Sequence, residues 1–238
     1  MSRVEFMKNK VYGILISYTE VGGIGMRKKG LLAVLLVMAM SLLSGCGGMS
    51  AEDASSYAKS VLDASYKGEF DDYIEWTKST EDEANELYEG NIDTTMEEAG
   101  FSDLGISEEL MASYRELFLD MVKHAKYEVG EAKESDNDAY TIDITVEPFI
   151  AFEGIQEEVT ASLTEEISNM TEIPSDEELN QMVFQRMYDL MAARMEDPAY
   201  GDPAIVTITV QPDADGVYYI SQEDMTALDD AMFPADSF

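Results

Sequence analysis

The side chain with the most distinctive chemistry in this sequence is Cys46, the only cysteine among 238 residues. Its thiol can form a thioether, the bond through which a protein can carry a diacylglycerol. The cysteine ends the stretch Leu43-Ser44-Gly45-Cys46, which closes an apolar run that begins at Leu31. A basic cluster, Arg27–Lys29, stands just before this run. Because a membrane-spanning helix needs about 20 apolar residues, the shorter run indicates a secretory signal rather than a transmembrane span.

Leu43, Ser44, Gly45 and Cys46 resemble the lipobox of bacterial lipoproteins, which the lipoprotein signal peptidase cleaves. The resemblance implies cleavage between Gly45 and Cys46, with residues 26–45 as the signal peptide and a lipid on Cys46. It also implies a mature protein held by that lipid on the extracytoplasmic face of the cell membrane. The alternative is a free cysteine that follows a buried helix. The coincidence of a basic cluster, an apolar run and a cysteine favours the lipobox.

The segments around this motif divide the chain. Residues 1–25 fit no part of a signal peptide, and Met26 begins a complete one, so residues 1–25 are a doubtful N-terminal extension. Alternatively, the weakly apolar Val11–Tyr18 lengthens the start of the signal. Residues 46–53 are expected to form a short lipidated tether. Residues 54–238 then form a single acidic domain, long enough for one hydrophobic core.

Acidic residues dominate the chain after its cysteine. Six of the 15 Lys and Arg residues and two of the 49 Asp and Glu residues precede Cys46, which leaves nine basic residues, 47 acidic residues and a formal charge of −38. No nucleic acid partner is expected, because nucleic acid binding depends on Lys and Arg at the phosphates. The charge also disfavours electrostatic attachment to anionic lipids, so the lipid must hold the protein. Solubility is the favoured explanation of the acidity, and a cation or basic-peptide receptor is the alternative.

The other polar side chains suggest no catalytic, cofactor-binding or metal-binding residues. Adjacent carboxylates such as Glu108-Glu109 diverge by about 100° around a helix, and several follow a serine cap, where they stabilise the helix dipole. Asp213–Gly216 resembles the start of a calcium loop, but a strand follows it at Val217–Ile220, so a hairpin turn is favoured. His124, the only histidine, lies at the end of a predicted helix and lacks the partners of a zinc or nucleophile site.

Methionines gather mainly on one face of a predicted helix, at Met182, Met187, Met191 and Met195. Core filling is their favoured role, since methionine packs well in irregular gaps. A soft groove for a partner is the alternative.

Hydrophobic periodicity predicts the elements that position these residues. Helical spacing recurs across residues 54–122 and again across 155–170 and 176–196. The predicted N-caps are Ser79, Ser107, Ser175 and Ser221. Alternation with a period of two predicts strands at 127–129, 140–146, 206–210 and 217–220. We therefore expect an α+β domain with helices packed on one face of a roughly four-stranded antiparallel sheet of two hairpins, in two layers.

Four stretches carry a resemblance to known proteins: Leu62–Tyr73, Ile144–Pro148, Ile208–Pro212 and Asp215–Ser221. Through them the chain resembles an uncharacterised family of lipoproteins from Gram-positive, clostridia-like bacteria. The helix-plus-hairpin plan also resembles small cystatin-like or NTF2-like extracytoplasmic domains. These resemblances imply no activity. We expect a binding or interaction module with a protein or peptide partner, and its rival is a cell-surface enzyme whose carboxylates converge only in the fold.

Overall fold

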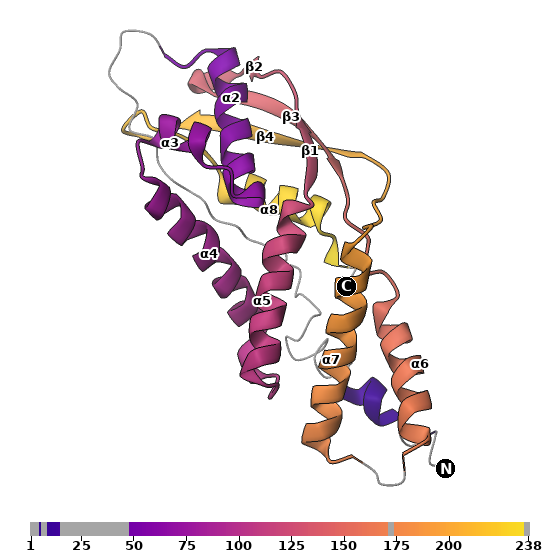
Figure 1. Cartoon of the computed structure of the whole chain (residues 1–238). Helices are drawn as coiled ribbons and strands as arrows, with labels where there is room; N and C mark the ends of the chain where they lie inside the picture. Colours follow the sequence, from indigo (N-terminus) through magenta and orange to yellow (C-terminus); the bar gives the residue numbers. More distant parts are fainter. Residues whose placement is uncertain (1–4, 6–8, 15–47, 171–173, 236–238) are drawn as a thin grey trace.

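The computed structural model describes residues 5, 9–14, 48–170 and 174–235 (Figure 1). The predicted signal peptide over 26–45 and the lipobox Leu43–Cys46, including the predicted lipidation site, lie outside these residues. Within the described ranges, no helix is both long and apolar enough to cross a membrane.

An antiparallel sheet forms one end of the molecule. Its strands are β1 (Lys126–Val129), β2 (Lys133–Glu134), β3 (Tyr140–Glu147), β4 (Ala204–Pro212) and β5 (Tyr218–Ile220). The order is β1-β3-β4-β5, and the short β2 also pairs with β3. The two predicted hairpins are therefore joined through β3 and β4, where Ile142 lies opposite Ile208. The α+β prediction with an antiparallel sheet is confirmed.

The alternation of apolar and polar residues along β3 buries one face of the sheet and leaves the other more exposed to solvent. Ile142, Ile144 and Val146 are fully buried, whereas the residues between them are half-buried. Helices α2 (Ala51–Leu62) and α8 (Gln222–Met232) pack on the buried face. This packing makes the expected two layers.

The longer helices extend the molecule away from the sheet (Figure 1). A π-helical turn (Asp63–Lys67) follows α2, and the remaining helices are α3 (Asp71–Thr77), α4 (Glu81–Glu98), α5 (Glu108–Lys123), α6 (Ile155–Ser168) and α7 (Asp176–Met195). Short 3-10 turns lie at Phe101–Asp103 and Asp136–Asp138. Helices α4 to α7 pack mainly on one another as two antiparallel pairs. The molecule thus has a sheet end and a helical end.

Most helix starts agree with the predicted caps. Ser107, Ser175 and Ser221 each accept a backbone N–H bond, and Ser175 forms a capping box with Glu178. The prediction of Ser79 as the cap of α4 is wrong. Thr80 caps this helix, because Thr80 and Glu83 exchange the two bonds of a capping box, while the Ser79 hydroxyl lies 2.7 Å from that of Thr77.

Helix α2 begins inside the segment expected to be a tether. Ser50 is its N-cap: the backbone N–H of Ser50 donates to the Asp53 carboxylate at 3.0 Å, and the backbone N–H of Asp53 donates to the Ser50 hydroxyl at 3.1 Å. Met49 is only 7% exposed, and its carbonyl accepts a hydrogen bond from the Tyr140 hydroxyl. Met49 is therefore packed into the domain, and residues 51–53 belong to helix α2 rather than to a tether.

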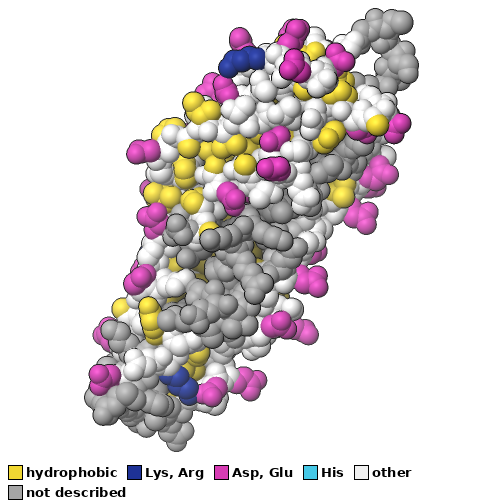
Figure 2. Space-filling model, turned by 180° about the vertical axis from the view of Figure 1, so that it is seen from behind, with side chains coloured by type: hydrophobic (Ala, Val, Ile, Leu, Met, Phe, Trp, Pro, Cys, Tyr) yellow, Lys and Arg dark blue, Asp and Glu magenta, His cyan; other side chains and the backbone are white. Residues whose placement is uncertain are grey.

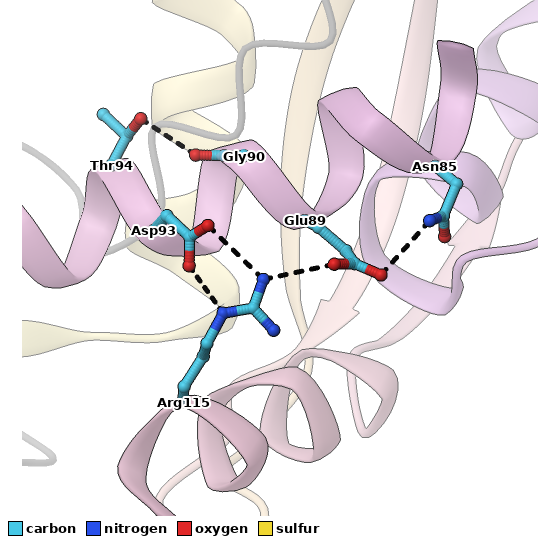
Figure 3. Close-up of polar contacts among 6 residues, drawn as sticks. All are labelled: Asn85, Glu89, Gly90, Asp93, Thr94 and Arg115. Atoms are coloured by element: carbon cyan, nitrogen blue, oxygen red, sulfur yellow. Dashed lines mark hydrogen bonds and ion pairs between the residues drawn. The ribbon is translucent and has the colours of Figure 1, made fainter. Parts of the chain in front are cut away.

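Arginines join the paired helices. Arg115 of α5 donates to Asp93 of α4 at 2.6 Å and to Glu89 at 3.3 Å (Figure 3). Arg186 and Arg194 of α7 make the same kind of contact with α6, as ion pairs Arg186–Glu166 and Arg194–Glu158. These contacts fix which helix faces meet, although exposed ion pairs add little stability.

Candidate functional site

A buried carboxylate at the π-helical turn is the centre of a polar network at the sheet end. Asp63 is 4% exposed and accepts hydrogen bonds from Lys67 at 2.9 Å, from Tyr127 at 2.6 Å and from Lys59. Burial alone would raise the pKa of Asp63, but the bonds from Lys59, Tyr127 and Lys67 outweigh it and hold the pKa below its ordinary value. Asp63 therefore stays ionised, with both oxygens engaged.

A second buried carboxylate, Asp229, bonds to the same π-helical turn. The Tyr66 hydroxyl donates to Asp229 of α8 at 2.5 Å, and both residues are fully buried. Burial, reinforced by Asp229, raises the pKa of Tyr66, so Tyr66 remains a neutral donor. The rings of Tyr66 and Tyr127 lie 5.9 Å apart. The π-helical turn thus ties α2 to β1 through Asp63 and to α8 through Tyr66, which makes it a joint of the fold.

A small acidic hollow opens next to this joint. It encloses about 420 Å³ and is lined by Asp63, Gly68, Glu69, Phe70, Asp71, Asp72 and Glu81. Its outer carboxylates are exposed to water, and Asp63 is already paired with two lysines. In the described part of the chain, no group of three or more His, Cys, Asp or Glu residues is arranged to hold a metal ion. The hollow can attract a hydrated cation, but it offers no preorganised ligand set.

A larger groove lies at the opposite, helical end of the molecule. It encloses about 1160 Å³ between the loop before α5, the end of α6 and the start of α7. Its lining residues are Gly105, Ile106, Ser107, Asn169, Met170, Pro174, Glu177, Glu178, Gln181 and Met182. The apolar members are half-buried and the acidic members are exposed. An acid-rimmed apolar groove of this kind suits a ligand with an apolar body and a basic group.

A helical turn at residues 9–14 lies beside this groove, between the ends of α6 and α7 (Figure 1). Val11 is fully buried, and Lys10 forms an ion pair with Asp176 of α7. A second hollow adjoins the groove, with which it has Gly105 and Glu177 in common, and is lined by Lys10, Gly13, Ile14, Gly105, Asp176, Glu177 and Asn180. The turn therefore covers part of the helical end.

Most basic side chains form ion pairs with carboxylates of the same chain. Of the nine Lys and Arg residues after Cys46, seven form ion pairs with Asp or Glu: Lys59, Lys67, Arg115, Lys126, Lys133, Arg186 and Arg194. Carboxylates are spread over the face seen in Figure 2, where Lys and Arg occupy only small spots. The outer surface is therefore left acidic and favours approach by basic ligands.

The residues singled out by sequence lie apart from one another. Glu108-Glu109 lies in the first turn of α5, as predicted for a dipole role. Asp213–Gly216 forms the predicted turn between β4 and β5, and Asp213 accepts bonds from the N–H groups of Asp215 and Val217 at 2.8 and 2.9 Å. His124 is the C-cap of α5, where its carbonyl accepts a bond from Tyr200 at 2.9 Å.

The methionines of α7 divide between the two roles considered for them. Met187, Met191 and Met195 are buried, which confirms core filling. Met182 is half-buried and lines the groove.

The sequence patterns considered above indicated neither Asp63 nor the groove as a functional site. The spacing of Lys59, Asp63 and Lys67 at four-residue intervals was an available signal, because residues four apart meet on a helix. No continuous stretch of sequence could indicate the groove, because its walls come from three separated segments.

No protein-family model and no curated protein matches this chain. A solved structure does resemble it: the crystal structure of ycdA from Bacillus subtilis, a protein provisionally described as a lipoprotein. The two share 15% sequence identity with a TM-score of 0.51, over 78% of this chain. The match covers 56% of ycdA, so this chain spans little more than half the length of its neighbour. The likeness establishes a shared fold. The resemblances to clostridial lipoproteins and to cystatin-like or NTF2-like domains stay predictions.

Proposed function

We propose that this chain is a membrane-anchored extracytoplasmic lipoprotein whose folded domain binds a protein or peptide. The observation that carries the proposal is the sequence Leu43-Ser44-Gly45-Cys46 at the end of a basic and apolar signal segment. The lipid on Cys46 holds the protein, and Gly45–Cys46 is the bond that the signal peptidase cleaves. The provisional description of ycdA as a lipoprotein supports the proposal.

The fold supports a fixed orientation at the membrane. The carbonyl of Met49 is held by Tyr140, only three residues after Cys46. Three residues span about 10 Å at most, so the sheet end lies close to the bilayer. Helix α7, with 20 residues, is about 30 Å long, and its N-terminus lies at the end of the molecule far from α2 (Figure 1). The acid-rimmed groove therefore faces away from the membrane, where partners can reach it.

Detergent partitioning tests this proposal with the native protein. Membranes are washed with alkaline carbonate, which removes peripheral proteins, and are then dissolved in a detergent that separates into two phases on warming. We expect the protein to resist the wash and to enter the detergent-rich phase, because two or more acyl chains give stable anchoring. A protein that is released by the wash and enters the aqueous phase would contradict the proposal.

A further inference from the structure

The groove at the helical end combines two features that a peptide-binding surface needs. Ile106, Met170 and Met182 provide half-buried apolar walls. Glu177 lines this groove in the first turn of α7. Asp176, directly before it, lines the adjoining hollow, and its side chain is 85% exposed. Apolar walls supply affinity, and rim charges select the sign of the ligand.

Residues 9–14 show how a short helix is seated on this end. Val11 is fully buried and Ile14 is half-buried, three residues further along the same helical turn. Tyr12 and Gly13 are exposed. Lys10, directly before the buried valine, pairs with Asp176. The face of this turn that contacts the domain therefore carries a basic residue at position i and aliphatic residues at positions i+1 and i+4.

The anchored protein lacks this turn if the proposed function holds, and the present inference rests on that function. Cleavage before Cys46 removes residues 9–14, and translation from Met26 would never produce them. In either case the surface that buries Val11 and pairs with Lys10 is vacated in the mature protein. An apolar surface of this kind, rimmed by charge, marks an interaction site.

We infer that the mature domain uses this vacated surface to bind a short amphipathic helix of another protein. The ligand helix carries Lys or Arg at position i, an aliphatic residue at i+1 and another at i+4. Its basic residue pairs with Asp176, and its first aliphatic residue fills the place that Val11 takes here. The binding mode is that of a helix in a groove, with a few anchors on one face. The groove faces away from the bilayer, so the partner approaches from the extracytoplasmic side.

A peptide-binding measurement tests this inference. The lipidated protein is purified from membranes in detergent and titrated against a fluorescent synthetic peptide with the sequence of residues 5–18, followed by anisotropy. We expect saturable binding. The Val11→Asp peptide should bind at least about tenfold more weakly, because a carboxylate would enter an apolar place.

Charge reversal tests the orientation of the ligand. The Asp176→Lys protein should bind the unchanged peptide about fivefold more weakly and should recover part of this loss with the Lys10→Glu peptide. The matched control is Asp197→Lys, which makes the same charge change at an exposed site beyond the other end of α7. This control should leave the affinity within about twofold.

Three results would overturn the inference: no saturable binding by the lipidated protein, equal affinity for the Val11→Asp peptide, or a dimer that the peptide does not dissociate. The last result would assign the groove to a second copy of this chain. The mass of the purified protein shows, independently of the peptide titration, whether the protein carries its lipid. A missing lipid contradicts the proposed function. A lipidated protein that does not bind the peptide contradicts only the inference that this surface binds a helix.

Discussion

Replacing Cys46 by serine is expected to transfer the protein from the membrane to the medium or to leave it as an uncleaved precursor. Serine has nearly the same size but cannot form the thioether that carries the diacylglycerol. Each buried CH₂ of an acyl chain contributes about 0.8 kcal/mol, so the lipid supplies nearly all of the attachment. The domain cannot compensate, because its formal charge of −38 is repelled by anionic lipids.

The measurement is immunoblotting of membrane, soluble and medium fractions, with radiolabelled fatty acid as a second readout. Ser44→Ala is the matched control, because it changes the neighbouring residue of the same motif and keeps it small. This control should leave both label and location unchanged. Retention of an unlabelled, cleaved Cys46→Ser protein in carbonate-washed membranes would show that something other than the lipid holds it.

Replacing Asp63 by asparagine is expected to lower the free energy of unfolding by about 2–4 kcal/mol. The amide has a single oxygen, so either Lys59 or the pair of Lys67 and Tyr127 would face an NH₂ group instead of an acceptor. Hydrogen bonds to buried charged groups contribute about 1.5–3 kcal/mol each. Urea unfolding followed by circular dichroism measures the loss.

Asp143 provides the matched control for this substitution. It also accepts from a lysine and a hydroxyl, Lys133 at 3.0 Å and Thr207 at 2.7 Å, but its side chain is 45% exposed on the open face of the sheet, whereas that of Asp63 is only 6% exposed. The Asp143→Asn change should therefore lower the free energy of unfolding much less than the Asp63→Asn change does. Equal losses of unfolding free energy for the two substitutions would contradict the role of Asp63 in tying α2 to β1.

The pH dependence of the Asp63 contribution follows from its lowered pKa. A carboxyl group whose pKa is lower in the folded state than in the unfolded state stabilises the fold above its unfolded pKa, about 3.9 for aspartate. That contribution is lost as the pH falls through the folded pKa. The stability difference between the wild type and Asp63→Asn should thus be constant near neutral pH and should shrink in acid below about pH 4.

Local rules predicted much of the fold. Ser175 with Glu178 predicted the start of α7, and the alternation around Ile142 and Ile144 predicted β3 and its buried face. Such signals act within a few residues, so a single sequence contains them. The prediction of the α4 cap failed because Ser79 and Thr80 are adjacent candidates. Only the presence of Glu83 three residues after Thr80 decides between them.

The candidate sites depend on contacts between distant segments, which sequence patterns do not show. A helical period of 3.6 runs through Asp63–Lys67 without revealing the π-helical turn, whose residues meet Tyr127 and Asp229 from other elements. The groove similarly joins Ile106, Met170 and Met182 across more than 70 positions. The lipobox is the opposite case, because a peptidase recognises it as a continuous stretch of chain.

The mass of the N-terminal peptide of the protein extracted from native membranes is the most direct test of the anchoring proposal. The account predicts that this peptide begins at Cys46 and carries a diacylglycerol on its sulfur, with fragment ions that place the lipid on that residue. A mature protein that begins at Met1 or Met26, or one in which Cys46 bears a free thiol, would contradict it.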